Sequence, residues 1–141
     1  MLQAFTAIAN DDYKLYRESL ALAPDDKELC NRMISQLEKK NNDSKSKGYL
    51  GAFTMIKANH VFSPIQKLKS FHAGRDMLEE AISKLPKDVE LRYVRYAIQI
   101  SIPKFLGYSK NRTDDRKFMM ENMKNSTKNL QADIQQLLKM N

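Results

Sequence analysis

The sequence predicts an all-α domain of about seven helices, arranged as antiparallel helical hairpins. Three observations support this fold class. Apolar residues recur at helical spacing through most of the chain, no segment alternates polar and apolar residues for long enough to form a strand, and only four glycines and four prolines interrupt the pattern. A chain of 141 residues suits one domain with one core. We therefore expect a single domain over residues 1–141.

The first 40 residues are expected to form an N-terminal helical hairpin. A short apolar stretch over residues 2–9 precedes a helix that Asn10 caps and that ends before Pro24. Asp25 or Asp26 then caps a second helix, whose apolar stripe is made by Leu29, Cys30, Met33 and Leu37. Residues 41–48 are predicted to be a polar loop, because the whole stretch 39–48 contains no apolar residue.

Residues 49–108 are expected to form the helical core. One helix begins at Tyr49 and carries His60 on its apolar face. Ser63 and Pro64 give a clear restart signal, since serine caps helices and proline suits the first helical position. The helix that follows runs to Pro86, and Gly74 is expected to loosen or bend it.

The least polar long stretch is 91–108, and we expect the chain to be organised around it. Asp88 caps a helix whose apolar positions cover roughly 200° of its surface, which predicts contacts with other elements on several sides. Pro103 ends this helix, and the apolar residues of the connector are expected to pack back onto the core. These connector residues are Phe105, Leu106 and Tyr108.

Residues 109–141 are expected to form the C-terminal helices. Thr113 is the predicted cap of the first, with Asp114 and Asp115 in its first turn and Phe118 and Met119 on its inner face. The last helix shows a regular apolar stripe made by Leu130, Ile134, Leu137 and Leu138.

An internal repeat suggests how the hairpins are related. Residues 24–29 and 86–91 both read P-x-D-x-E-L, and each copy joins two predicted helices. Two units of about 31 residues would fill the distance between the copies, close to the length of a helix-turn-helix repeat. The segment 74–95 resembles the second helix of a tetratricopeptide repeat (TPR), whereas 48–52 matches the first helix of that consensus poorly. We therefore expect a TPR-like arrangement.

A more specific resemblance covers residues 49–118. Its motifs include Y-x-G-A from residue 49, K-A-x-H from residue 57, E-L-R from residue 90, I-Q from residue 98 and F-L-G-Y from residue 105. This pattern resembles a family of small uncharacterised helical proteins of Bacteroidota, many of which carry a signal peptide. The resemblance implies a helical fold and an exported location, and it implies no activity.

Composition limits the classes of function. The net charge is +7 and the isoelectric point about 9.5, which permits acidic partners such as nucleic acid, anionic lipid or an acidic protein. Lys57, Lys67, Lys69 and Arg75 follow one another without an intervening acid. No apolar run approaches the length of a membrane span. We expect a cytoplasmic protein if Met1 is the native start and a periplasmic or exported one if a signal peptide was removed.

One group of polar residues is the candidate binding site. Arg92, Arg95 and Gln99 share one stripe of the central helix, where two arginines could hold a carboxylate or phosphate. The alternative is that the arginines form structural ion pairs with Glu79, Glu80 or Glu90, and that His60 is a hydrogen-bonded core residue. The candidate site residues are His60, Lys67, Arg92, Arg95, Tyr96 and Gln99.

No motif predicts catalysis, a metal site or a cofactor. His60 and His72 lie on different predicted helices, and the metal-ligand spacings H-x-x-x-H, C-x-x-C and E-x-x-H are absent from the sequence. Cys30, the single cysteine, lies on an apolar face, which favours a buried and inert thiol. Helix capping accounts for the paired aspartates before acid–base chemistry does.

We therefore expect a non-enzymatic module that binds a protein or peptide in a basic groove. In this hypothesis the arginine stripe and Tyr96 line the groove and hold an acidic or C-terminal segment. A second hypothesis is a small anionic ligand bound between helices around His60, Lys67 and Arg92. A third is nonspecific binding of nucleic acid through the basic surface, although a reading element for nucleic acid is not evident. The oligomeric state is left open.

Overall fold

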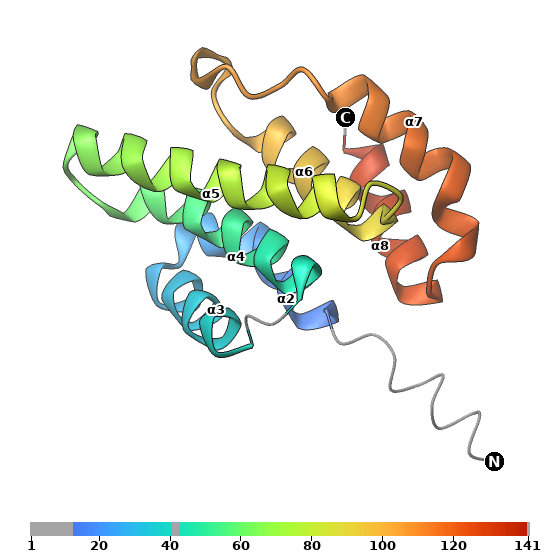
Figure 1. The fold of residues 1–141 in the computed structure, drawn as a ribbon, viewed down its shortest axis with the longest axis horizontal. Helices are drawn as coiled ribbons and strands as arrows, with labels where there is room; N and C mark the ends of the chain where they lie inside the picture. Colours follow the sequence, from blue (N-terminus) through green and yellow to red (C-terminus); the bar gives the residue numbers. More distant parts are fainter. Residues whose placement is uncertain (1–12, 41–42, 141) are drawn as a thin grey trace.

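A computed structural model describes residues 13–40 and 43–140 of the chain (Figure 1). These residues form seven α-helices and four short 3-10 turns, and none of them lies in a β-strand, so the predicted all-α class is confirmed. The apolar stretch 2–9 and the predicted cap Asn10 lie outside the described residues. Within the described part, no helix is both long and apolar enough to cross a bilayer.

The helices follow one another with short connections. The α-helices are α2 (Lys14–Leu22), α3 (Lys27–Lys39), α4 (Ser44–Ile56), α5 (Pro64–Lys84), α6 (Val89–Ser101), α7 (Arg112–Asn122) and α8 (Lys128–Lys139). The 3-10 turns are η1 (Ala23–Asp25), η2 (Lys57–His60), η3 (Lys104–Leu106) and η4 (Met123–Asn125).

Side-chain caps fix most of the helix starts. Asp26, Ser63 and Asp88 accept hydrogen bonds from backbone N–H groups three residues later, as predicted for α3, α5 and α6. The prediction for α7 was wrong by two residues, because the helix begins at Arg112 after Asn111 and Thr113 lies inside its first turn.

The predicted polar loop 41–48 is the main error in the element boundaries. Helix α4 begins at Ser44, and Asp43 caps it by accepting a 2.7 Å hydrogen bond from the backbone N–H of Ser46. Ser46 and Gly48 are buried in the interior. A stretch without apolar side chains is therefore the first turn and a half of a core helix.

Helices α4 and α5 form a tight antiparallel hairpin. Gly51 faces Gly74, and the Ser70 hydroxyl donates a 2.7 Å hydrogen bond to the backbone carbonyl of Thr54. The expectation that Gly74 loosens α5 is replaced by a packing role, since its missing side chain lets the two backbones approach. Figure 1 shows this hairpin lying across the molecule.

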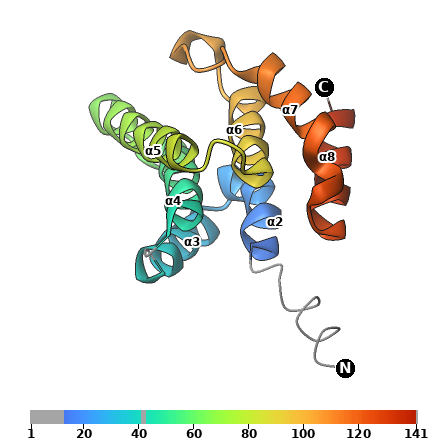
Figure 2. The ribbon, with the colours of Figure 1, turned by 45° about the vertical axis from the view of Figure 1, so that its right-hand side comes forward.

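Two helices share the centre of the fold. Helix α6 contacts α4, α5, α7 and α8, so the prediction that other elements cover it on several sides is confirmed. Helix α4 contacts α2, α3, α5 and α6, and nine of its thirteen residues are buried against eight of thirteen in α6. Figure 2 shows α7 and α8 covering one side of α6, with α2 beside α8.

The connector after α6 packs only in part as predicted. Tyr108 is buried against the ring of Phe71, and Leu106 is partly buried against the core. Phe105 is 85% exposed, because it points out of the η3 turn instead of returning to the core.

The two P-x-D-x-E-L copies share their local geometry but differ in burial. Asp26 and Asp88 cap α3 and α6 in the same way. Glu28 is exposed on α3, whereas the equivalent Glu90 is buried on α6. The TPR-like repeat itself stays a prediction.

Candidate functional site

The arginine stripe predicted to line a groove lies between α6 and α7. Arg95 is 6% exposed and binds Asp115 through two hydrogen bonds, from Nε to Oδ2 at 2.7 Å and from Nη2 to Oδ1 at 2.8 Å. Its Nη1 group also donates to the Glu79 carboxylate at 3.0 Å. All three donor groups of Arg95 are therefore directed at carboxylates of its own chain.

Arg92 and Gln99 contribute to the same interface. Arg92 donates to Asp115 at 3.2 Å and to the carbonyl oxygen of Pro86 at 2.7 Å. The Gln99 amide donates to Asn111 at 3.1 Å. These residues hold α6 against α7. The arginines therefore form structural ion pairs, the alternative to a ligand-binding role.

The partner that sequence reasoning missed is Asp115. Glu79 was among the predicted partners of the arginines, whereas Asp115 was assigned to the first turn of a helix as a favourable charge. Asp115 is fully buried and stands four residues before the buried Met119, so both lie on the inner face of α7. That spacing is the signal that could have identified it.

The charges of this interface stabilise one another. Burial alone would lower the pKa of Arg95, but Asp115 and Glu79 outweigh burial and raise it above its ordinary value. The Tyr108 hydroxyl donates to Glu79 at 2.5 Å, and burial together with that carboxylate raises the pKa of Tyr108. The arginine therefore stays charged and the tyrosine neutral over the physiological range.

A second buried charge cluster joins helices that are distant in sequence. Arg17 of α2 donates to Glu90 of α6 at 2.7 Å and to Asp133 of α8 at 2.7 Å. The buried Tyr49 hydroxyl donates to the same Glu90 carboxylate at 2.5 Å, and Lys45 lies 3.5 Å from it. This cluster links α2, α4, α6 and α8 inside the fold, and it was not predicted.

His60 and Lys67 lie away from the arginine stripe. His60 is in η2, not on the apolar face of a helix, and its Nε2–H donates to the carbonyl oxygen of Ala23 at 2.8 Å. Lys67 donates to the carbonyl oxygen of Ala58 at 3.0 Å. From Lys67 to Glu79, the α5 partner of Arg95, the helix rises by about 18 Å. These side chains therefore do not converge with Arg92 on one pocket.

An open basic depression lies beside the stripe, between the end of α6, the η3 turn and the start of α7. Its volume is about 540 Å³. Its lining residues are Tyr96, Lys104, Ser109, Arg112, Thr113 and Arg116. Tyr96 is the only one of the predicted site residues among them. Lys104 and Arg112 form no ion pair with any residue in the described ranges, which leaves their charges available.

Arg116 holds the edge of this depression. Its Nη1 group lies 3.4 Å from the Tyr96 hydroxyl and 3.3 Å from the carbonyl oxygen of Leu138. Both partners are uncharged, so the positive charge of Arg116 is not neutralised by these contacts. We call the six lining residues the basic depression.

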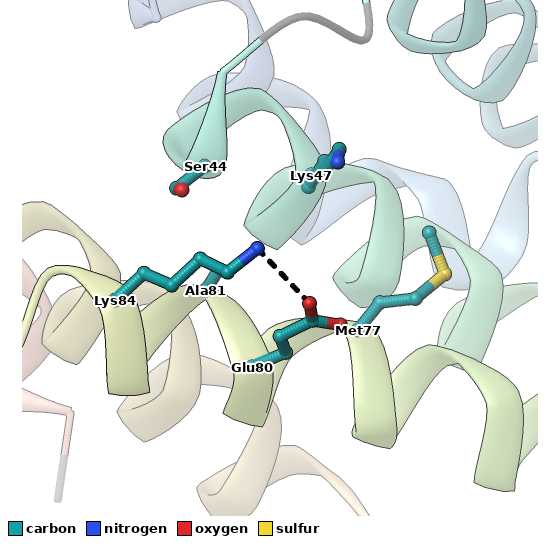
Figure 3. A pocket seen from close by; sticks show the side chains of 6 residues that line it. All are labelled: Ser44, Lys47, Met77, Glu80, Ala81 and Lys84. Atoms are coloured by element: carbon teal, nitrogen blue, oxygen red, sulfur yellow. Dashed lines mark ion pairs between the residues drawn. The ribbon is translucent and has the colours of Figure 1, made fainter.

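A smaller hollow lies between the start of α4 and the end of α5 (Figure 3). Its volume is about 140 Å³, enough for a few water molecules. Figure 3 shows the Lys84 side chain directed toward Glu80, and the two form a 3.1 Å ion pair. Lys84 is already paired, and the Glu80 carboxylate offsets the charge of Lys47, so this hollow is a poorer site for an anion than the basic depression.

Cys30 is a buried thiol, as its position in the sequence predicted. It is fully buried, and its Sγ–H lies 3.4 Å from the carbonyl oxygen of Phe53. Burial raises the pKa of Cys30 to about 11, so the reactive thiolate is scarce at neutral pH.

Comparison of the chain with known protein families, with curated proteins and with solved structures finds no match.

Proposed function

We propose that this protein is a non-enzymatic helical interaction module that binds an acidic peptide segment in the basic depression. The observation that supports this most directly is the charge of the depression. Lys104 and Arg112 have no ion-pair partner among the described residues, and the hydrogen bonds of Arg116 to those residues go to uncharged groups. This site replaces the groove that the arginine stripe was predicted to form.

The chemistry of the lining fits a carboxylate-rich segment. The guanidinium of Arg112 presents paired N–H donors that match a carboxylate, and Lys104 adds a mobile positive charge. The hydroxyls of Ser109 and Thr113 add neutral hydrogen-bonding groups, and the Tyr96 ring adds apolar contact area. The site is therefore suited to an acidic stretch that also carries apolar side chains.

The shape of the depression favours a segment over a small ligand. Small-molecule sites bury most of the surface of their ligand. This depression is open along one side of α6 and α7, so a peptide could lie across it and continue beyond it.

The test is peptide binding with a charge-matched control. A fluorescent acidic peptide with apolar residues between its carboxylates is titrated with the protein, and anisotropy is recorded. Lys104→Ala combined with Arg112→Ala is expected to weaken binding at least about tenfold, as expected for losing two charge-assisted contacts. The control is Lys27→Ala combined with Arg32→Ala on α3, which removes the same charge from two exposed positions.

The control decides between a site and a general charge effect. We expect the α3 double variant to bind within about twofold of the native protein. Equal weakening by both variants would contradict the proposal and would favour nonspecific attraction, which oligonucleotide binding with a steep salt dependence would then identify.

A further inference from the structure

We propose that the free end of the α4–α5 hairpin docks on an anionic lipid surface. This end, residues 57–69, consists of η2, the connection 61–63 and the first six residues of α5, and we call it the hairpin tip. The proposal is independent of the acidic-peptide site, because the tip and the basic depression share no residue.

Three large apolar side chains of the hairpin tip face solvent. Phe62 is 98% exposed, Ile65 73% and Leu68 48%. Ile65 and Leu68 lie three residues apart on α5 and therefore share one face of the helix, and Phe62 precedes that face by three further residues. Single exposed apolar residues are common on protein surfaces, but three neighbours in so short a segment form a patch.

Local geometry explains why Phe62 stays exposed. It occupies the position before the Ser63 cap, where an apolar residue often packs onto the fourth residue of the helix. That fourth residue is Lys67, whose ammonium group instead donates to the carbonyl oxygen of Ala58. Pro64 and the Ser63 cap hold the start of α5 in place. The Phe62 ring is thus presented on a rigid base with no apolar partner in the staple position.

Positive charge lies beside the patch. Residues 57–69 contain three lysines and no aspartate or glutamate. Lys57 and Lys69 of the hairpin tip are exposed beside the apolar residues. The neighbouring η1 turn brings two acids close to the tip. Asp25 is exposed, and the Asp26 carboxylate is occupied in capping α3. An apolar patch with a basic rim complements a bilayer whose headgroups are anionic.

The shape of the hairpin tip favours a bilayer over a protein partner. In Figure 1 the start of α5 forms the left-hand end of the molecule and extends beyond the other helices. A protruding phenylalanine needs a preformed pocket on a protein partner, whereas a lipid interface admits aromatic and aliphatic side chains without one. The lysines would first attract the tip to anionic headgroups, and Phe62 with Ile65 would then enter the interface.

The first experiment measures binding to vesicles. The full chain is mixed with neutral phosphatidylcholine vesicles and with vesicles that contain phosphatidylserine, and the bound fraction is measured by flotation. We expect binding to the anionic vesicles only. Phe62→Ser combined with Ile65→Ser should reduce the partition coefficient at least about tenfold, given the apolar area that these side chains would bury. Phe105→Ser, at another highly exposed phenylalanine on η3, should change the partition coefficient by less than about twofold.

A spectroscopic readout reports which surface enters the bilayer. The chain contains no tryptophan, so Phe62→Trp introduces a single reporter and Phe105→Trp gives a matched control. We expect a blue shift of emission with anionic vesicles for the residue 62 reporter and no shift for the residue 105 reporter.

Several outcomes would overturn the proposal. They are absence of binding to anionic vesicles, binding that survives the double serine substitution, and an unchanged spectrum of the residue 62 reporter on vesicles that do bind the protein. Lys104→Ala combined with Arg112→Ala is expected to leave vesicle binding within about twofold. Loss of vesicle binding in that variant alone would assign the lipid contact to the basic depression and contradict a role for the hairpin tip.

Discussion

Asp115 is the carboxylate on which two arginines of α6 depend. It is fully buried and accepts hydrogen bonds from both Arg92 and Arg95. Glu79 is the other carboxylate bound to Arg95, and its side chain is 38% exposed. Because Arg95 is itself buried, removal of Asp115 would leave a buried positive charge with only one partly exposed partner.

We predict that Asp115→Ala lowers the free energy of unfolding by about 3 to 5 kcal/mol, the range found when one partner of a buried ion pair is removed. Urea denaturation followed by circular dichroism measures the change. The matched control is Asp114→Ala, since Asp114 is exposed in the same helical turn and should cost less than about 1 kcal/mol. A cost for Asp115→Ala as small as that of the control would show that the ion pairs add little stability.

Cys30 is expected to make the protein less stable as the pH rises above about 9. Its thiol titrates near 9.0 when unperturbed and at about 11 in the fold, because burial disfavours the thiolate. The folded state therefore binds this proton more tightly than the unfolded state does. The resulting stabilisation is fully present below pH 9 and is lost as the pH rises towards 11.

We predict that the native protein loses about 2 kcal/mol more stability between pH 8 and pH 11 than Cys30→Ala does. Comparing the two proteins cancels the titration of the lysines. Burial also raises the pKa of Tyr93, from 10.0 to about 12, and the resulting alkaline loss of stability is the same in both proteins and cancels. Parallel stability curves for the two proteins, from urea denaturation at each pH, would contradict the assignment.

The sequence alone predicted part of the arrangement of the arginine stripe. Periodicity placed Arg92, Arg95 and Gln99 correctly on one stripe of α6, but it could not tell which element would face that stripe. Asp115 comes from a helix that approaches only after the chain reverses through η3. Lys104 and Arg112 gave no signal, because nothing in the sequence distinguishes an unpaired surface cation from a paired one.

The hairpin α4–α5 depends on two glycines whose backbones touch. A methyl group built at Gly51 would lie 2.5 Å from the carbonyl oxygen of Gly74 and 2.8 Å from the backbone nitrogen of Leu78. A methyl group at Gly74 would collide with the backbones of Gly51 and Met55. Backbone atoms cannot rotate away, so either substitution would force the helices apart.

We predict that Gly74→Ala destabilises the protein by about 2 kcal/mol or more, although alanine is the better helix former by about 1 kcal/mol. Thermal and urea unfolding measure the effect. Ala73→Gly is the control that measures helix propensity alone. Ala73 is exposed on the same helix, and its substitution should cost about 1 kcal/mol. A stabilising Gly74→Ala would mean that the contact relaxes freely.

The start of α4 shows why a helix boundary was misplaced. The stretch before Tyr49 holds no apolar side chain, and such stretches are usually loops. Here Ser46 and Gly48 are buried because they are small, and Asp43 stabilises the turn by capping it. Periodicity detects large apolar residues facing a core and fails where helices meet through small ones.

The fold class was predictable because the helical period extends through most of the chain. The helices with long apolar stripes, such as α3, α6 and α8, were located within a few residues. The packing of α8 on α2 was not predictable. Helix α8 packs on α2 and α6, and Asp133 binds Arg17 across 116 residues of sequence. No local pattern encodes a contact of that separation.

Arg17 connects three helices, so it should contribute to the cooperativity of the whole domain. Its side chain is 1% exposed and binds Glu90, whose side chain is 6% exposed, and Asp133, whose side chain is 30% exposed. If Arg17 is removed, Glu90 keeps hydrogen bonding from Tyr49 and the ammonium of Lys45 but loses its closest cation. If Asp133 is removed instead, Arg17 keeps Glu90.

We therefore predict unequal costs for the two ends of this cluster. Arg17→Met should lower the free energy of unfolding by about 3 to 5 kcal/mol, because it leaves a carboxylate buried without its main counter-ion. Asp133→Asn should cost about 1 kcal/mol, because water can reach that side chain and the asparagine oxygen still accepts a hydrogen bond. Urea denaturation of both variants, followed by circular dichroism and tyrosine fluorescence, measures the costs and tests for a single transition. Equal costs would show that Arg17 acts mainly through α8, whereas two separate transitions in Arg17→Met would show that the cluster holds otherwise independent halves of the domain together.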